Sequence, residues 1–340
     1  MNIDKLQLIL DKEPGFRLKQ VFEGAFKKLV SDWNEVTNLP KKLQEELNER
    51  CSLVISGEIF ESSDGKTFKA LITLKDGLKI EAVLMRYEDG RNSLCVSSQI
   101  GCALGCKFCA TGKMGLKRDL SVGEILDQFL FFARFLKNRF GENERITNVI
   151  FMGMGEPFLN YDNVMKSIEI LNDEEKIGLG ARNISVSTSG IIDGVRRFSG
   201  EDRQVNLAIS LHAPNDELRS ELMPINRKDK LRDVLGAVDE YISKKNRKVM
   251  FEYLLIDSVN DTEENARELT VLMKKPLYMV NLINYNPTGN FKPSSGKNVE
   301  RFLNVLKKAG VNATLRRSFG GDIRAACGQL VGDDENSEEA

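Results

Sequence analysis

Three cysteines, Cys102, Cys106 and Cys109, stand close together in one glycine-rich stretch of the chain. Their C-x3-C-x2-C spacing brings three thiolates into one loop, which contains no further cysteine or histidine. A zinc site would need a fourth such ligand at comparable spacing. An iron–sulfur cubane held by three thiolates keeps one iron open to an outside molecule. The loop therefore predicts an iron–sulfur cluster with an open position; the alternative is that these cysteines are small buried side chains.

The remaining cysteines and the histidine narrow the possible chemistry. The chain has six cysteines, of which the other three are Cys51, Cys95 and Cys327. Its one histidine, His212, disfavours sites that combine histidine with cysteine and any triad not centred on that residue. The sequence has no secretory signal pattern and no apolar run of the roughly 18 residues that a membrane helix needs. We therefore expect a cytoplasmic, reducing location, no membrane partner, and cysteines that bind metal or do redox chemistry.

The formal net charge of −1 at pH 7 is unevenly distributed along the chain. Residues 332–340 contain five acidic side chains and no basic one, and subtracting those five negative charges from the total leaves +4. We expect an acidic, disordered tail at 332–340 and a mildly basic body. This charge balance neither requires nor excludes an RNA partner.

The cysteine loop resembles the signature of radical S-adenosylmethionine (SAM) enzymes, in which an aromatic residue such as Phe108 precedes the last cysteine. The resemblance implies a 4Fe-4S cluster on Cys102, Cys106 and Cys109, with the amino and carboxylate groups of SAM on the open iron. It also implies that an electron from the cluster splits the sulfonium and produces a 5′-deoxyadenosyl radical. A flavodoxin-like protein is the implied electron donor.

Short polar motifs follow several of the expected strands. In Met-Gly-Met-Gly-Glu-Pro, Gly155 and Glu156 come after a strand that ends near residue 152, and they resemble the motif that receives the SAM amino group. Hydroxyl, imidazole and amide groups at later strand ends suit the carboxylate, ribose or adenine of SAM. The alternatives are a structural glycine turn, a satisfied core histidine and a turn before proline. The predicted SAM contacts are Gly155, Glu156, Ser187, Ser210, Leu211, His212 and Asn286.

Two further cysteines indicate the subfamily. Cys95 lies seven residues before the cluster motif, and Cys327 lies in Ala-Ala-Cys-Gly-Gln-Leu after the last expected strand. Taken alone, each would more often be a buried thiol than a catalytic one. Together with the other motifs, in order over nearly the whole chain, they resemble the RNA adenine methyltransferases of the RlmN/Cfr type. Cys51 matches no motif and is expected to be a small apolar core residue.

The resemblance implies a mechanism in which sulfur carries the methyl group and two SAM molecules are used per turnover. One SAM methylates Cys327, and the radical from the second removes a hydrogen atom from that S-methyl group. The carbon radical adds to the adenine, and Cys95 resolves the covalent adduct, leaving a transient Cys95–Cys327 disulfide that must be reduced. Glu81 matches the family's proposed proton acceptor; the alternative is an exposed glutamate on the polar face of a strand.

Two details resemble the branch that modifies C2 of adenine. Pro157 follows Gly-Glu, and Ala-Pro-Asn-Asp occupies residues 213–216. The C8, antibiotic-resistance branch lacks this proline after Gly-Glu and this Asn-Asp pair. The implied substrates are the peptidyl-transferase-centre adenine of 23S rRNA and, in tRNA, the adenine 3′ of the anticodon. The alternative in this family is a C8-adenine 23S rRNA methyltransferase. Outside it, the open hypotheses are a radical-SAM enzyme for a small molecule or peptide and an iron–sulfur electron carrier.

The elements that must position these residues alternate between strand and helix from about residue 95. Apolar, β-branched runs predict strands at 148–152, 183–187, 205–211, 249–256, 278–283 and 313–316. Amphipathic segments predict helices at 122–140, 161–171, 231–244, 263–273 and 299–309. This alternation predicts a mostly parallel α/β sheet or barrel with its chemistry at the C-terminal strand ends. The resemblance to radical-SAM enzymes implies that this α/β core is a partial (β/α)6 radical-SAM barrel.

The first part of the chain has a different pattern. Residues 1–50 have helical spacing, and strands at 67–74 and 79–85 predict a hairpin. We therefore expect a helical RNA-binding accessory domain at 1–50, a β-hairpin extension at 51–94, the radical-SAM core at 95–331 and the acidic tail at 332–340. A monomer is expected. The basic residues expected to contact RNA phosphates are Lys113, Lys117, Arg118, Arg316 and Arg317.

Overall fold

The computed structural model describes residues 1, 3–289 and 291–332. One mixed sheet runs through it in the order β1-β2-β3-β4-β7-β8-β9-β10-β11-β12, and a separate hairpin pairs β5 with β6. All of the predicted tail except Gly332 lies outside the described residues. The strands are β1 (Ser56–Glu61), β2 (Thr67–Thr73), β3 (Lys79–Arg86), β4 (Asn92–Cys95), β5 (Gln99–Gly101), β6 (Leu116–Asp119), β7 (Asn148–Phe151), β8 (Ile184–Thr188), β9 (Asn206–Ser210), β10 (Val249–Leu255), β11 (Tyr278–Asn284) and β12 (Ala313–Arg316).

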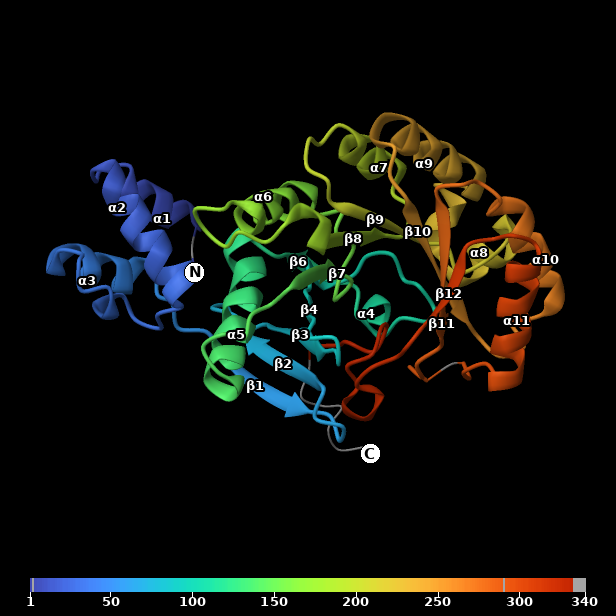
Figure 1. The fold of residues 1–340 in the computed structure, drawn as a ribbon, viewed down its shortest axis with the longest axis horizontal. Coiled ribbons are helices and arrows are strands. Elements are labelled where there is room, and N and C mark those ends of the chain that lie inside the picture. Colours follow the sequence, from blue (N-terminus) through green and yellow to red (C-terminus); the bar gives the residue numbers. More distant parts are fainter. Residues whose placement is uncertain (2, 290, 333–340) are drawn as a thin grey trace.

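From β4 to β12 every pair of neighbouring strands in the main sheet is parallel. Parallel neighbours need crossover connections, and helices on the outer face of the sheet supply them (Figure 1). Within the described residues this gives six strand–helix units followed by β12, and the sheet does not close because β1 and β12 are its edges. The predicted α/β partial barrel is confirmed. The crossover helices are α5 (Val122–Phe140), α6 (Tyr161–Asn172), α7 (Ile192–Ser199), α9 (Leu231–Lys245), α10 (Glu263–Leu272) and α11 (Gly296–Lys308).

Local sequence signals explain where several of these helices begin and end. Ser121 and Glu124 form a reciprocal capping box at the start of α5. Asn246, in the left-handed conformation with φ 49°, ends α9. The shorter helices α4 (Ala110–Lys113), α7 and α8 (Asp216–Leu222) were not predicted, because one or two turns carry too little periodicity to recognise.

Strands β1, β2 and β3 extend the main sheet in antiparallel fashion, and β3 pairs with β4. The predicted hairpin is confirmed, and it is continuous with the core sheet. The outer strand β1 was missed because its side chains are largely exposed and polar, so it lacks the apolar alternation of a strand with one buried face.

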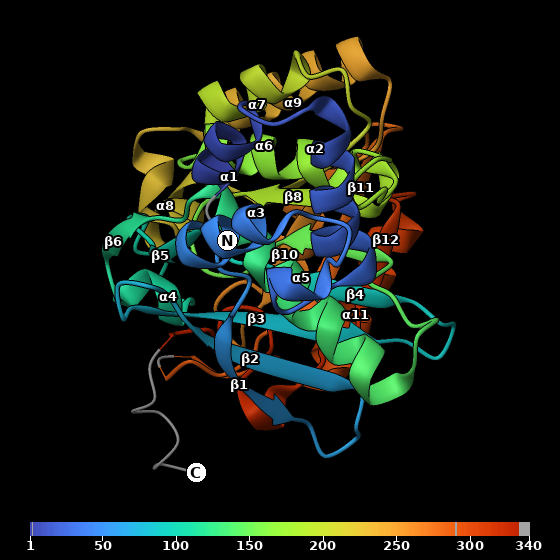
Figure 2. The same ribbon diagram turned by 90° about the vertical axis from the view of Figure 1, so that its left-hand side faces the viewer.

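The N-terminal helices α1 (Ile3–Leu10), α2 (Gly15–Phe22) and α3 (Lys41–Arg50) lie together at one end of the molecule, beside α5 (Figures 1 and 2). Their apolar side chains belong to the same contiguous core as the sheet. Cys51 is fully buried in that core, as predicted. In the described part of the chain, no helix combines the length and apolar character that crossing a membrane requires.

Candidate active site

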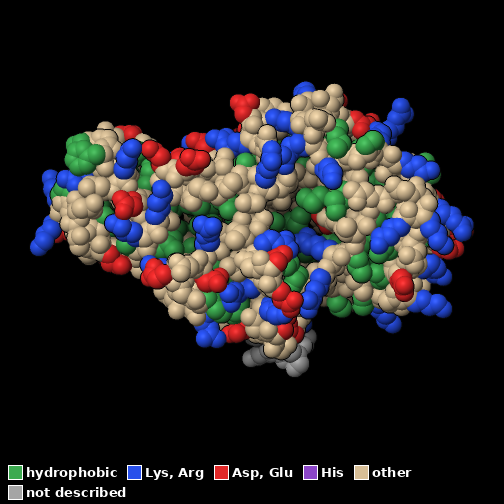
Figure 3. Space-filling view, viewed as in Figure 1, with side chains coloured by type: hydrophobic (Ala, Val, Ile, Leu, Met, Phe, Trp, Pro, Cys, Tyr) green, Lys and Arg blue, Asp and Glu red, His purple; other side chains and the backbone are tan. Residues whose placement is uncertain are grey.

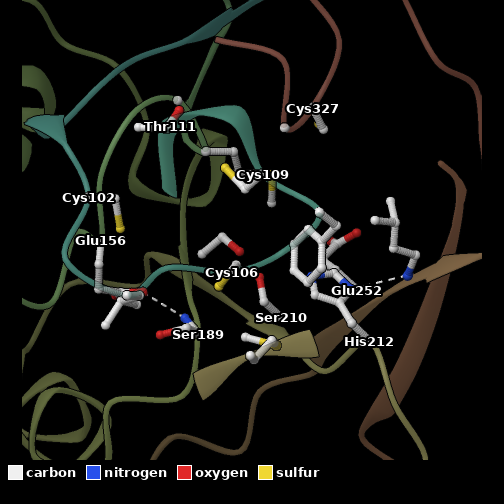
Figure 4. A pocket seen from close by; sticks show the side chains of 18 of the residues that line it. Cys102, Cys106, Cys109, Thr111, Glu156, Ser189, Ser210, His212, Glu252 and Cys327 are labelled. Atoms are coloured by element: carbon white, nitrogen blue, oxygen red, sulfur yellow. Dashed lines mark hydrogen bonds between the residues drawn. The ribbon is translucent and has the colours of Figure 1, made fainter. Parts of the chain in front are cut away.

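The C-terminal ends of the core strands surround a cavity of about 950 Å³, part of it open to solvent. Figure 4 shows the cysteines of loop 102–109, here called the cluster loop, around a common space, with Cys327 on the C-terminal segment nearby. The structure therefore unites motifs that are far apart in the sequence. The predicted residues that line this cavity are Cys102, Cys106, Cys109, Gly155, Glu156, Ser187, Ser210, His212 and Cys327.

Backbone contacts hold the cluster loop in place. The N–H of Cys102 donates to the carbonyl of Gly115 at 3.1 Å, and the N–H of Lys107 donates to the carbonyl of Leu222 at 3.0 Å. Gly101 has φ 74°, and a Cβ atom there would lie 1.8 Å from the Gly115 oxygen, so only glycine fits. Because backbone groups fix the loop, the thiol groups are left for a ligand.

The three thiols suit a cluster better than a single metal ion. Burial raises the pKa of Cys102 to about 11 and also raises the pKa of Cys106 and Cys109, so a bound cation is needed to stabilise the thiolates. Among the described residues, no three Cys, His, Asp or Glu side chains form a group that could hold one metal ion. The ligands of a 4Fe-4S cluster each bind a different iron, so they need not converge on one point. The donor set fits such a cluster with one iron left open.

Glu156 is buried beside the cluster loop and accepts two backbone hydrogen bonds. The N–H of Phe158 donates to one carboxylate oxygen at 3.0 Å, and the N–H of Ser189 donates to the other at 2.7 Å (Figure 4). Gly155 has φ 96°, and a Cβ atom there would lie 2.5 Å from the Cβ of Gln99. Burial raises the pKa of the Glu156 carboxyl, so a ligand ammonium group would favour its charged form. The geometry supports the predicted role of binding an amino group.

His212 presents one ring nitrogen to the backbone and leaves the other for a ligand. Its Nδ1 accepts a hydrogen bond from the N–H of Leu254 at 3.1 Å, and its ring packs edge-on against Phe108 with centroids 4.7 Å apart. Burial lowers the pKa of His212 to about 3, so the ring is neutral at pH 7. With Nδ1 accepting, the proton resides on Nε2. The residue is both a core histidine and part of the cavity wall.

A second, largely apolar cavity of about 490 Å³ adjoins the first, and Cys327 lines both. Cys95 lines only the second cavity. Burial, followed by the nearby Cys327, raises the pKa of Cys95 to about 12, so this thiol is neutral at pH 7. The amide of Asn286 donates to the carbonyl of Cys327 at 3.2 Å and helps to place the C-terminal segment. The structure thus brings together the two cysteines that the sequence singled out.

Two predicted site residues, Leu211 and Glu81, line neither cavity, and Asn286, a predicted SAM contact, lines only the second. Leu211 is fully buried, and its N–H donates to the carbonyl of Glu252 at 2.9 Å. Glu81 lines neither cavity: its carboxylate pairs with Lys69 Nζ at 2.9 Å and accepts from the N–H of Val331 at 2.7 Å. The alternative of an exposed glutamate is wrong, because Glu81 is buried. Its predicted role as proton acceptor stays a prediction.

Arg219 is a structural residue of the site that the sequence did not reveal. It is fully buried and donates to the carbonyls of Ser189 at 2.6 Å, Ser210 at 3.1 Å and Leu211 at 3.2 Å. It therefore ties the ends of β8 and β9 together beneath the ligand cavity. Burial lowers its pKa to about 10, so it stays charged at pH 7. A charged residue in a polar helix resembles a surface residue, so no sequence signal marks it.

Glu252, which the sequence analysis missed, also lines the first cavity, as does Arg316, one of the residues expected to contact RNA phosphates. Glu252 interrupts the apolar sequence of β10, a signal that could have identified it. One of its carboxylate oxygens accepts from Asn281 at 3.1 Å, whereas the other is buried and has no hydrogen-bond partner among the described residues. Arg316 lines both cavities, and its positive charge opposes the rise in the pKa of Glu252 caused by burial.

Comparison with known proteins agrees with this geometry. The sequence model of the radical SAM superfamily matches residues 96–270, which span the cluster loop and the core strands β7 to β10. A radical SAM methyltransferase from Sphaerobacter thermophilus has a solved structure that superimposes with a TM-score of 0.93, at 43% identity over 98% of each chain. Fold and site together define a radical-SAM enzyme.

Relatives of known sequence identify the family within this class. A protein of Dictyoglomus thermophilum is 44% identical over 97% of this chain and 94% of its own length. One of Caldicellulosiruptor saccharolyticus is 46% identical over 94% of this chain and 91% of its own length. Both are named as probable dual-specificity RNA methyltransferases RlmN. The chain belongs to the RlmN family of radical-SAM methyltransferases.

Proposed function

We propose that this protein methylates C2 of adenine in RNA. The proposed targets are the peptidyl-transferase-centre adenine of 23S rRNA and the adenine 3′ of the anticodon in tRNA. The observation that carries the proposal is the position of Cys327, which lines both the cavity of the cluster loop and the cavity that contains Cys95. A sulfur atom at this junction can receive a methyl group on one side and meet a resolving thiol on the other. The RNA specificity of the named relatives supports the substrate class.

The cavity residues have distinct proposed roles. Cys102, Cys106 and Cys109 hold the 4Fe-4S cluster, and Glu156 and His212 orient SAM beside it. When bound, the cluster and two SAM molecules per turnover supply the methyl group, one electron and the hydrogen-abstracting radical. An electron-donor protein of the flavodoxin type reduces the cluster, and the enzyme acts as a cytoplasmic monomer.

The chain itself carries the methyl group between SAM and the base. Cys327 Sγ accepts the methyl group and then loses one hydrogen atom from it to the radical, and the resulting methylene carbon bonds to adenine C2. The adduct gives up its unpaired electron to the cluster and its C2 proton to a base, which restores the aromatic ring. Cys95 Sγ attacks Cys327 Sγ and breaks the sulfur–carbon bond; the methylene carbon takes the electron pair and the Cys95 proton to become the methyl group, and a disulfide forms. Two electrons and two protons from a thiol reductant restore the two thiols. Proton removal from C2 is assigned to Glu81, whose carboxylate must first separate from Lys69.

Nucleoside mass spectrometry tests the reaction. Anaerobically reconstituted protein is incubated with 23S rRNA or tRNA, SAM and a reductant, and 2-methyladenosine is the expected product. If only 8-methyladenosine formed, the C8 alternative would replace the proposal. Cleavage of SAM without any methylated nucleoside would favour the hypothesis of a small-molecule or peptide substrate.

Substitution of the thiols tests the roles assigned to them. Cys327→Ala should abolish RNA methylation while the iron content is unchanged, because Cys327 is not a cluster ligand. Cys95→Ala should accumulate a covalent protein–RNA adduct, visible as a shifted band on a denaturing gel, since nothing resolves it.

Cys51→Ala is the matched control, because Cys51 is a buried thiol that lines neither cavity. It should retain methylation and form no adduct. Normal methylation by Cys327→Ala would exclude the S-methylcysteine route.

A further inference from the structure

One wall of the second cavity carries aromatic and basic side chains that the proposed chemistry does not use. Arg317, Ser318 and Phe319 line this cavity beside Cys95 and Cys327. Arg317 and Ser318 are exposed and Phe319 is partly exposed, so this wall reaches solvent. It therefore lies where a substrate chain would pass if its target base entered the site.

The ring of Phe319 is held in place from one side. It packs edge-on against Tyr87, with ring centroids 4.9 Å apart and planes at 62°. Arg91 lies over the Tyr87 ring at 4.4 Å and anchors it. The guanidinium of Arg317 lies 5.6 Å from the Phe319 centroid, far looser than the 3.6 Å of the tightly stacked pair Arg86 and Phe140. The face of Phe319 toward Arg317 is thus not tightly covered by that cation.

Arg317 is also more available than the neighbouring cations. Arg91 is bound to Asp89 at 2.8 Å, and Arg118, an expected phosphate contact, is bound by Asp76 and Glu124. Arg317 makes no ion pair within 4.0 Å with any residue that the structure describes. Its charge does act on Glu88, whose pKa is lowered first by the hydrogen-bonded Lys66 and in addition by Arg317. Figure 3 shows lysine and arginine side chains around a hollow near the middle of the face drawn, with acidic side chains beside them.

We infer that Phe319 and Arg317 bind the nucleotide next to the adenine that is modified. This inference rests on the proposed function and adds to it a specific recognition site for single-stranded RNA. A base that enters a buried site must leave its stack, so its neighbour loses a stacking partner. The Phe319 ring replaces that partner, and the Arg317 guanidinium moves from the ring to the adjacent phosphate. Both contacts tolerate different neighbouring bases, since they read a ring face and a phosphate.

Steady-state kinetics with a tRNA anticodon stem-loop test this site. Phe319→Ala should raise the KM for RNA about tenfold, the size expected for one lost base–aromatic stack. Phe319→Trp should restore it, whereas Phe319→Leu should not, because leucine fills space without stacking. Arg317→Ala should weaken binding and reduce by about one the slope of log affinity against log salt. The KM for SAM and the rate of SAM cleavage without RNA should not change.

Arg139→Ala is the matched control, because Arg139 is also exposed and lies 5.7 Å from a phenylalanine ring, that of Phe140 on α5. It should leave the KM for RNA unchanged. The inference is overturned if the wild type methylates RNA and Phe319→Ala has the same KM, or if Phe319→Leu restores binding. It is also overturned if Phe319→Ala slows only turnover driven by a protein reductant, which would make this wall a docking site for the electron donor. No methylation by the wild type would instead reject the proposed function.

Discussion

At the scale of single residues, burial sets the protonation state of the groups in the cavity. Cys95 and His212 are both neutral at pH 7, Cys95 because its pKa is raised to about 12 and His212 because its pKa is lowered to about 3. Glu156 is also buried, but two backbone N–H groups face its carboxylate. The site is thus prepared to bind a ligand that brings its own positive charge.

The neutral state of His212 predicts a pH dependence of stability. The pKa of histidine in the unfolded chain is near 6.5, whereas burial lowers it to about 3 in the folded protein. Between these values only the unfolded state binds the proton. The contribution of neutral His212 to the unfolding free energy is therefore fully present above pH 6.5 and decreases as the pH falls. The unfolding free energy should decrease by up to about 1.4 kcal/mol per pH unit in this range.

His212→Gln removes the titrating group but keeps an acceptor for the Leu254 N–H. Urea unfolding between pH 7 and pH 4.5 should show a shallower loss of unfolding free energy for this variant than for the wild type. Identical slopes would mean that His212 titrates normally in the folded protein.

At the scale of elements, the cluster loop and the C-terminal segment hold each other. The N–H of Ala110 donates to the carbonyl of Gly328 at 2.7 Å, and the hydroxyl of Thr111 donates to the carbonyl of Leu330 at 2.6 Å. These bonds place Cys327 beside the cluster ligands although it is on the last segment of the fold. Anything that distorts the loop should therefore also displace the thiol.

Gly101→Ala tests this coupling. A Cβ atom at Gly101 would collide with the Gly115 carbonyl at 1.8 Å, in addition to the strain of φ 74°. The variant should lose cluster iron on reconstitution and lose RNA methylation.

Gly105→Ala is the control, because Gly105 has a similar φ of 63° but no atom within 4 Å of an added Cβ. It should cost only about 1 kcal/mol of unfolding free energy from backbone strain and should retain most of its iron. Equal iron content in both variants would show that the contact with Gly115 does not shape the loop.

At the scale of the whole molecule, one arginine connects the N-terminal helices to the core. Arg134 on α5 donates to the carbonyls of Leu29 at 3.1 Å, Val30 at 2.6 Å and Leu53 at 2.8 Å. Burial lowers the pKa of Arg134, and the nearby charges of Asp127 and Glu35 oppose this shift. The N-terminal helices thus share an apolar core and a buried polar contact with the catalytic part.

Arg134→Met should therefore loosen the N-terminal region. The substitution leaves up to three carbonyl groups without their donor, and we expect a loss of about 3 kcal/mol in unfolding free energy. Limited proteolysis should cut faster within residues 23–55, while iron content stays unchanged.

Lys137→Met is the control, since the Lys137 side chain makes a long 3.4 Å bond to the Lys28 carbonyl and an exposed ion pair with Glu142, and no other such contact within the described part of the chain. It should change stability by less than about 0.5 kcal/mol. Equal cleavage rates in the two variants would contradict the role of Arg134.

The sequence by itself determined the glycine-rich loop of three cysteines predicted to hold the cluster, the order of most core strands and helices, and the polar motifs at strand ends. These signals are local: ligand spacing, hydrophobic periodicity and turn residues act over a few positions, so they can be recognised without the fold. Short elements such as α8 and the largely exposed strand β1 have too weak a hydrophobic periodicity to be recognised in this way.

Only the tertiary structure decided which charged residues are buried and which thiols meet. Arg219 ties two strand ends together and Glu252 faces the ligand cavity, yet their neighbours along the chain do not specify these contacts. Glu81 pairs with Lys69 through strand register, and Cys95 and Cys327 come to share a cavity because the C-terminal segment folds back onto the cluster loop. Each of these outcomes depends on contacts between distant segments, whose burial and electrostatics exist only once the chain has folded.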